Sequence, residues 1–162
     1  MLLAPISAKA TLTSDAPREY VWRAFESAPR WPEVLQDIQG AHIEPDGRLV
    51  AGAVMRSQAV PGTMAVDMAY QVLEAERPHR LVTESTAAQF RARVEYQFAE
   101  GARGGTQITL ASTVRAERAS MRLYIALQRK RHTELIEGSL NRRMRAMLDL
   151  AEKIWREETQ GH

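Results

Sequence analysis

The sequence predicts an α+β fold in which a curved antiparallel sheet of six to seven strands wraps around a long C-terminal helix. Three observations predict it. Apolar and polar residues alternate with period two through most of residues 39–115, and the period becomes helical over residues 117–157. Between the first strand and this sheet, residues 16–38 have the spacing of two short helices.

The chain has the size and composition of one globular domain. Its 162 residues are 44% hydrophobic and 26% charged, which are ordinary values for a folded domain. No internal repeat, linker or low-complexity segment interrupts it. We therefore expect a single domain over residues 1–162.

The N-terminal third predicts one strand and two short helices. Residues 6–13 alternate apolar and polar side chains, which is typical of a strand with one face in water. Tyr20, Val21, Ala24 and Phe25 then give one apolar helical face, which the proline at position 29 ends. A second short helix is expected to open at Trp31, with its buried side running to the isoleucine at position 38.

Turn residues divide the segment 39–115 into strands. Pro-Asp-Gly at 45–47, Pro-Gly at 61–62, Arg-Pro at 77–78 and the glycine-rich stretch 101–105 are the turn signals. In the long strand predicted at 63–75, one face carries Met64, Val66, Met68, Tyr70 and Val72. The opposite face carries Asp67, so a slip of one residue would bury this carboxylate.

A long helix is predicted from residue 117 to residue 157. Apolar residues recur there mostly at steps of three and four, which is the spacing of one buried helical face. A straight helix of that length would span about 60 Å, more than a domain of this size offers. Gly138 is therefore predicted to mark a kink or a point of close packing.

Several short motifs in this order resemble the START-like (SRPBCC) superfamily, which includes polyketide cyclases, coenzyme Q-binding proteins and plant allergens related to birch pollen. The motifs that carry the resemblance are Ala16-Pro17, Val21-Trp22, Trp31-Pro32, Gly52, Val72-Leu73-Glu74, Pro78-His79-Arg80-Leu81, Tyr96-Gln97-Phe98, Gly104-Gly105-Thr106 and Leu148-Asp149-Leu150-Ala151-Glu152. The resemblance implies a helix-grip fold with an internal ligand cavity. It does not imply one reaction, since carriers, enzymes and sensors share the fold.

The concave face of such a sheet supplies the candidate ligand-binding residues. The predicted inward set is mostly apolar with a few hydroxyls, which suits a small hydrophobic ligand. Its members are Met55, Ser57, Met64, Val66, Met68, Tyr70, Thr83, Ser85, Phe90, Ala92, Val94, Tyr96, Ile108 and Leu110. Trp31 is expected to be buried near the mouth of the cavity. The alternative is that these side chains pack a solid core.

His132 is the candidate catalytic residue if the protein is an enzyme. It falls on the predicted inward stripe of the long helix, with Gln128 one turn before it. A histidine opposite Tyr96 or Tyr70 could move protons near neutral pH. The alternative is a partly exposed histidine beside the basic run 129–131.

The residues required for metal binding, phosphate binding or covalent catalysis are missing from the sequence. There is no cysteine, the four histidines have no ligand spacing, and neither a phosphate-binding loop nor a nucleophile motif is present. We expect no metal and no cofactor. Nucleic-acid binding is not expected either, since aromatic residues are not interleaved with the basic ones. No signal peptide or membrane-spanning run is evident, so the expected location is the cytoplasm.

Three functions remain open. The first is a module, monomer or homodimer, that encloses a small hydrophobic or aromatic molecule such as a lipid, isoprenoid or polyketide-like compound. The second is an aromatase/cyclase-type enzyme that promotes aldol cyclisation and dehydration. The resemblance implies a pocket arginine for it, whereas Arg56, Arg91 and Arg93 fall on the predicted outer face. The third is a helper protein whose basic helix, with nine Arg or Lys against three Glu over residues 115–145, docks peripherally on a membrane or a partner.

Overall fold

The described part of the chain forms one seven-stranded antiparallel sheet and three α-helices. The computed structural model describes residues 5–59, 66–87 and 90–161. The strands are β1 (Ile6–Ser14), β2 (Ile38–Glu44), β3 (Val54–Ala59), β4 (Val66–Glu76), β5 (Arg80–Ala87), β6 (Phe90–Glu100) and β7 (Thr106–Ala116). The helices are α1 (Arg18–Glu26), α2 (Ala119–Leu127) and α3 (Arg129–Gln160), and short 3-10 turns are η1 (Ala28–Glu33) and η2 (Ala102–Gly104).

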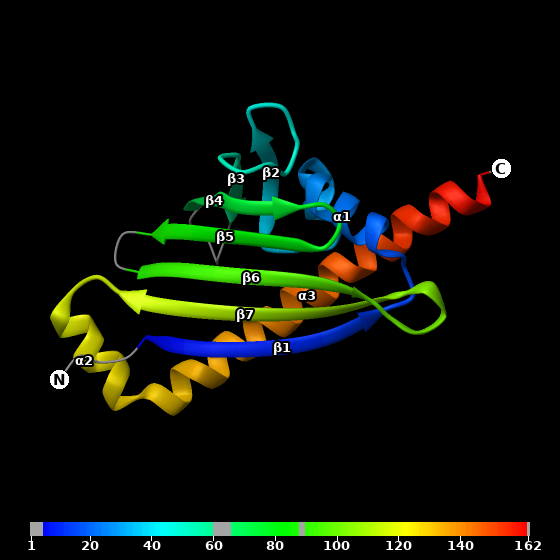
Figure 1. The fold of residues 1–162 in the computed structure, drawn as a ribbon. Helices are drawn as coiled ribbons and strands as arrows, with labels where there is room; N and C mark the ends of the chain where they lie inside the picture. Colours follow the sequence, from blue (N-terminus) through cyan, green and yellow to red (C-terminus); the bar gives the residue numbers. More distant parts are fainter. Residues whose placement is uncertain (1–4, 60–65, 88–89, 162) are drawn as a thin grey trace.

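The sheet is open and highly curved, and α3 lies across its concave side. The strand order is β1-β7-β6-β5-β4-β3-β2, so the first and second strands form opposite edges. Figure 1 shows α3 running obliquely under the sheet, with α1 beside its C-terminal half. In this arrangement α3 packs most closely on β1 and α1. The predicted α+β helix-grip fold is confirmed.

The register of β4 agrees with the predicted alternation. Asp67 is exposed and Val72 is buried, as expected if the apolar side of this strand faces the core. Met64 lies outside the described residues, as does the side chain of Val66. A bulge between Val72 and Glu74 then shifts the pairing with β5 by one residue.

The prediction for the C-terminal helix was wrong about its interruption. The helix breaks at Gln128, whose φ of −121° and ψ of 31° are not helical, and this residue separates α2 from α3. Gly138 lies inside α3 without a break. A Cβ atom at this position would meet only the Arg142 Nη1 atom at 3.6 Å, so Gly138 is not a point of close packing either.

The two predicted short helices are one α-helix and one 3-10 turn. Pro29 and Pro32 both fall inside η1, where the missing amide hydrogens fit a short turn better than an α-helix. Ile38 was predicted to belong to the second helix, but it begins β2 and is 5% exposed. Its burial was right, and its secondary structure was wrong.

The core fills the space between the sheet, α1 and the C-terminal half of α3. Its largest fully buried side chains include Trp22, Leu81, Ile108, Leu110, Leu148 and Leu150. At the end of β1 the Ser14 hydroxyl donates a hydrogen bond to Glu152 Oε1 of α3 at 2.9 Å. Apolar packing and this polar contact together fix the second half of α3 on the sheet.

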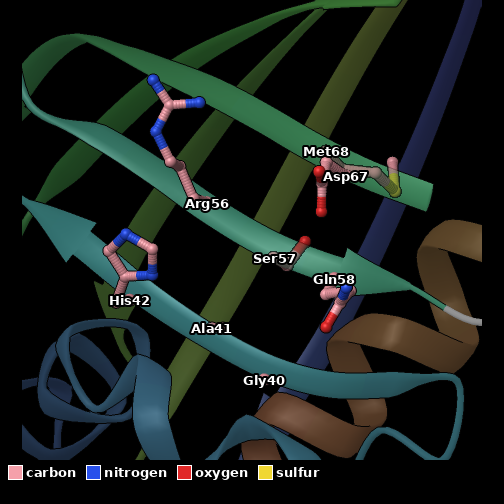
Figure 2. Close-up of a pocket in the computed structure, with 8 residues that line it drawn as sticks. All are labelled: Gly40, Ala41, His42, Arg56, Ser57, Gln58, Asp67 and Met68. Carbon is pink, nitrogen blue, oxygen red and sulfur yellow. The ribbon is translucent and has the colours of Figure 1, made fainter. Parts of the chain in front are cut away.

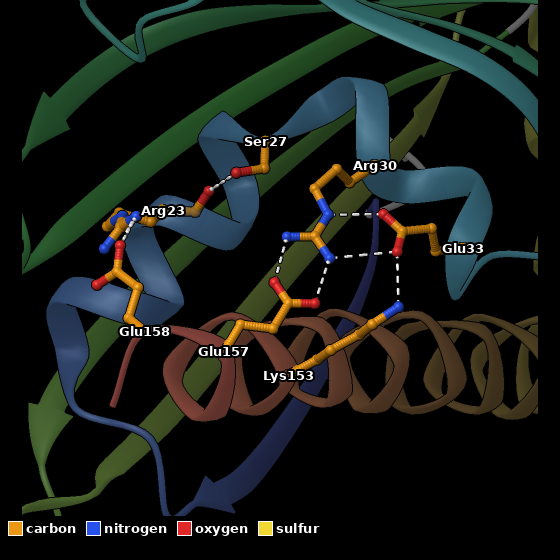
Figure 3. Close-up of polar contacts among 7 residues, drawn as sticks. All are labelled: Arg23, Ser27, Arg30, Glu33, Lys153, Glu157 and Glu158. Carbon is orange, nitrogen blue, oxygen red and sulfur yellow. Dashed lines mark hydrogen bonds and ion pairs between the residues drawn. The ribbon is translucent and has the colours of Figure 1, made fainter. Parts of the chain in front are cut away.

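Ion pairs join η1 to the same half of α3. Arg30 makes a bidentate pair with Glu157, with both N–O distances 3.0 Å, and donates to Glu33 at 2.6 Å. Lys153 donates to the other Glu33 oxygen at 2.7 Å. Figure 3 shows this network beside the separate pair of Arg23 with Glu158.

Acid should weaken this network within a defined pH range. The hydrogen bonds from Arg30 and Lys153 lower the pKa of Glu33 to about 2. An unfolded glutamate has a pKa of about 4.3, so the contribution is complete above that pH and is lost as the pH falls towards 2. We expect the melting temperature of Glu33→Gln to fall less than that of the wild type between these values.

The matched control for this measurement is Glu100→Gln, which changes an exposed carboxylate at the end of β6. Its melting temperature should follow the wild-type pH profile. Identical profiles for Glu33→Gln and the wild type would contradict the assignment of this acid sensitivity to Glu33.

Candidate functional site

Strand register brings the predicted inward residues to one face of the sheet. Met55 pairs with Tyr70, Tyr70 with Ser85, and Ser85 with Ala92. Directly paired residues point to the same side of an antiparallel sheet. The described members of the predicted set therefore share the inner face: Met55, Ser57, Met68, Tyr70, Thr83, Ser85, Phe90, Ala92, Val94, Tyr96, Ile108 and Leu110.

This inner face is unequally covered along the strands. At the end beneath α1 its side chains are buried: Val72, Leu81, Thr83, Phe98, Ile108 and Leu110. At the other end the side chains of β4, β5 and β6 remain partly accessible: Met68, Tyr70, Ser85, Phe90, Ala92 and Val94. We call this second group the open end. Their neighbours Ser57, Ser112 and Ala116 on β3 and β7 are buried, and Tyr96, opposite Leu81 and Leu110, lies between the two groups. Apolar side chains on a concave face that stay accessible are typical of a surface that a ligand covers.

An aromatic cluster separates the open end from the core. The ring of Tyr96 lies 5.1 Å from that of Phe25, edge to face, and is stacked at 6.3 Å on that of Phe98. Trp22 packs edge-on against Phe98 at 6.0 Å. These rings hold Tyr96 in one orientation, because each has few torsions and many contacts.

Burial and neighbouring polar groups affect the pKa of the Tyr96 hydroxyl in opposite directions. Burial, followed by the nearby Tyr70, raises the pKa of Tyr96, while Arg143 and a hydrogen bond with Thr83 act in the opposite direction. The phenol therefore stays neutral at ordinary pH, so it can donate a hydrogen bond but is a poor base. Tyr70 donates its own hydroxyl to the Met68 sulfur at 3.8 Å.

Arg143 is the site residue that sequence reasoning missed. It belongs to α3, acts electrostatically on Tyr96, and pairs with Asp37 at 3.3 Å. The arginines considered for the pocket from the sequence, Arg56, Arg91 and Arg93, all lie on strands. The available signal was helical spacing, since position 143 lies three residues after Leu140 and four before the buried Met147.

His132 lies elsewhere on α3. Its ring contacts Tyr124 of α2 at 5.7 Å, and its buried Nε2 atom has no hydrogen-bond partner among the described residues. Arg143 lies eleven positions further along the same continuous α-helix, about 16 Å along the axis. The catalytic pairing of His132 with Tyr96 or Tyr70 stays a prediction. The ring contact with Tyr124 places His132 beside α2.

Four further predicted residues do not line the open end. Trp31 is 7% exposed in η1, and its indole N–H donates to the Ala24 carbonyl oxygen at 3.0 Å. Met55 and Thr83 are buried in the sheet at 5% and 1% exposure. Gln128 is exposed at the junction of α2 and α3. Their contribution to ligand binding stays a prediction.

A pocket of about 420 Å³ lies across β2, β3 and β4 (Figure 2). Its residues are Gly40, Ala41, His42, Arg56, Ser57, Gln58, Asp67 and Met68. By register, His42 pairs with Arg56 and Gln58 with Asp67 on the outer face, so much of this lining is polar or charged. Only Ser57 and Met68 belong to the predicted inward set. The pocket therefore shares Met68 with the open end, and the rest of its lining is different.

The arginines predicted to face outward do so. Arg56, Arg91 and Arg93 are exposed, and each lies near a glutamate of the sheet's outer surface. None of the three points to the inner face. Within the described ranges, no group of three or more His, Asp or Glu side chains could hold a metal ion, and no helix is long and apolar enough to cross a membrane.

Comparison with solved structures gives full-length matches to the fold. The protein TTHA0849 from Thermus thermophilus is 18% identical with a TM-score of 0.71, and the match covers 91% of this chain and 98% of that one. Norcoclaurine synthase from Thalictrum flavum is 13% identical with a TM-score of 0.65, over 93% of this chain and 89% of that one. At such identities the likeness establishes the fold alone.

A two-domain aromatase/cyclase, BexL from the BE-7585A biosynthetic pathway, is also similar. It is 20% identical with a TM-score of 0.70, and the match covers 94% of this chain and 50% of that protein. No curated protein matches the sequence. Residues 5–153, however, match the family described as polyketide cyclase/dehydrase and lipid transport. Because this match spans nearly the whole chain, the protein belongs to the polyketide cyclase/dehydrase and lipid transport family.

Proposed function

We propose that the protein binds a small hydrophobic or aromatic molecule, of lipid, isoprenoid or polyketide-like character, against the open end of the inner face. The observation that carries this proposal is the unequal coverage of that face. Phe90, Ala92 and Val94 belong to the concave side of the sheet yet remain partly accessible. Covering them with an apolar ligand would be favourable by about 25 cal/mol per Å² of apolar surface removed from water.

The polar groups beside this surface suggest the ligand's chemistry. A neutral Tyr96 hydroxyl and the Arg143 guanidinium are hydrogen-bond donors, and Tyr70 adds a second hydroxyl. They suit a molecule with an apolar body and an oxygen acceptor, such as a carbonyl, at one end. These donors already have partners within the protein: Thr83 for Tyr96, Asp37 for Arg143 and Met68 for Tyr70. An oxygen acceptor on the ligand would add to or replace these contacts, and a wholly hydrocarbon ligand would make no use of them.

Native mass spectrometry of the purified protein tests this proposal. We expect a fraction of the protein to carry a non-covalent mass of one small molecule, which extraction with organic solvent removes. The extracted protein should then bind 1-anilinonaphthalene-8-sulfonate, an apolar aromatic fluorophore, with a stoichiometry of one at this face. Finding neither a retained molecule nor saturable fluorophore binding would contradict the proposal.

A second candidate is catalysis of aldol cyclisation and dehydration, and Arg143 is the observation that favours it. In the dehydration the α-carbon would lose a proton and the Arg143 guanidinium would stabilise the enolate oxygen that forms. A phenol would protonate the hydroxyl that leaves as water and would regain its proton from the α-carbon through solvent. His132 would be a proton-transfer group in this candidate only if a ligand or water chain reached it from Tyr96.

The same mass spectrometry separates the two candidates. A carrier returns a poly-β-ketone probe with its mass unchanged, whereas a cyclase returns it lighter by one water. Loss of that reaction in Arg143→Gln, with fluorophore binding retained, would support the enzyme.

A further inference from the structure

Large apolar side chains are exposed together where α2 meets α3. Leu123 is 55% exposed, Tyr124 51%, Leu127 77% and Leu135 61%. Among the described residues only Val50 is a comparably exposed large hydrophobic residue elsewhere. Leu123 and Leu127 are four residues apart, on one face of α2. Single exposed leucines are ordinary on protein surfaces, but four within residues 123–135 form a patch that suggests a binding partner.

Positive charge surrounds this patch. Residues 118–135 contain five Arg or Lys residues and one acidic residue, Glu134. Arg122 donates to the Ala116 and Glu117 carbonyl oxygens, so its guanidinium is held at the base of α2. Lys130 and Arg131 are exposed in the first turn of α3. We call residues 118–135 the basic corner.

The basic corner projects from one end of the molecule. In Figure 1, α2 turns away from the end of β7 and meets α3 at an angle, next to the start of β1. The break at Gln128 produces this turn and presents two short helical surfaces at the same edge. The other end of α3, residues 149–160, has four acidic side chains against two basic ones, Lys153 and Arg156. The charge of the protein is therefore polarised along α3.

We propose that the basic corner binds the surface of an anionic lipid bilayer. Leucine and tyrosine side chains flanked by arginine and lysine are typical of helices that lie in the interface of a membrane. A second copy of the chain is a poorer partner, because a symmetric contact would bring the five basic residues of each copy together. An acidic protein would match the charge, but charge alone leaves the exposure of Leu127 unexplained.

The position of the corner connects it to the open end. The strand β7 leads directly into α2, and its last residues pair with Phe90 and Ala92 at the start of β6. A bilayer bound at the corner would thus lie at the accessible end of the inner face. The inference about the membrane goes beyond the proposed ligand binding and does not depend on it.

Vesicle co-sedimentation tests the proposal. The full chain is mixed with vesicles of phosphatidylcholine alone, or of phosphatidylcholine with phosphatidylglycerol. We expect binding to the anionic vesicles only, weakening as salt is added. Lys130→Gln with Arg131→Gln should lower the partition coefficient about 30-fold, since each basic residue near an anionic surface contributes about a factor of five. Leu127→Ala should lower it about tenfold through lost apolar contact.

Matched controls change the same residue types elsewhere. Lys9→Gln with Arg156→Gln removes two exposed charges from β1 and from the far end of α3, and Val50→Ala shortens the exposed apolar side chain outside the patch. Both controls should bind as the wild type does. Equal weakening by the charge control would mean that net charge alone drives binding and would overturn the proposal. So would an absence of vesicle binding, including a case where the corner instead mediates dimerisation or binds an acidic protein.

Discussion

Replacing Trp31 with alanine should lower the free energy of unfolding by roughly 3–5 kcal/mol. The side chain is 7% exposed and belongs to the core between η1, α1 and β2. Its indole N–H donates to the Ala24 carbonyl oxygen at 3.0 Å, which ties η1 to the end of α1. The substitution would leave a large cavity and would also leave the Ala24 carbonyl oxygen without its hydrogen-bond donor. The cavity and the lost hydrogen bond both lower the free energy of unfolding.

Urea unfolding followed by circular dichroism measures this change. Trp31→Phe should cost less than the alanine variant, because the ring is largely replaced and only the hydrogen bond and some volume are lost. Trp155 is the matched control, since it is only partly buried against the core, and Trp155→Ala should cost less than Trp31→Ala. A loss below about 1 kcal/mol for Trp31→Ala would mean that this residue is peripheral.

The strands were predictable because the alternation of apolar and polar residues indicates both that a segment is a strand and which of its faces is buried. In β1, every second residue from Ile6 to Ser14 is buried and those between are exposed, as the sequence pattern requires. In β4, one exposed carboxylate at Asp67 was enough to fix which face is inward. A register error would move a whole set of side chains across the sheet, so the correct register is strongly favoured.

The helix break could not be predicted from the same kind of pattern. Apolar residues continue at three- and four-residue steps on both sides of Gln128, and a chain can change direction there without disturbing that spacing. Gly138 looked like the weaker point because glycine costs about 1 kcal/mol in a helix. In a helix of 32 residues fixed by packing, that cost is tolerated.

The strand residues of the candidate site were predictable from the sequence, and the helical residue that lies near them was not. Strand pairing places Tyr70 and Tyr96 on a known face, although Tyr70 lies opposite Ser85 and Tyr96 opposite Leu81, four residues further along β5. Which helical residue meets them depends on where along its axis the helix crosses the sheet. His132 and Arg143 lie on comparable stripes of α3, but their axial positions differ by about 16 Å. Only the tertiary structure determines that Arg143 is the one near Tyr96.

Replacing Ala92 with tryptophan should strongly weaken the proposed ligand binding while leaving the fold intact. Ala92 lies on the inner face between Ser85 of β5 and Val114 of β7, and all three side chains are only partly buried. A large ring at this position would occupy the surface proposed for the ligand. We expect the affinity for the aromatic fluorophore to fall about 100-fold or more, which corresponds to at least about 2.7 kcal/mol.

Stability distinguishes this result from simple misfolding. If the open end is a binding surface, the tryptophan has room and the free energy of unfolding should change by less than about 1 kcal/mol. In a solid core the same insertion would force neighbouring side chains apart and cost about 1–3 kcal/mol or more. Arg93→Trp, on the outer face of the same strand, is the matched control and should keep wild-type fluorophore affinity. Strong destabilisation of Ala92→Trp, or unchanged binding by it, would show that the inner face is packed and that any ligand binds elsewhere.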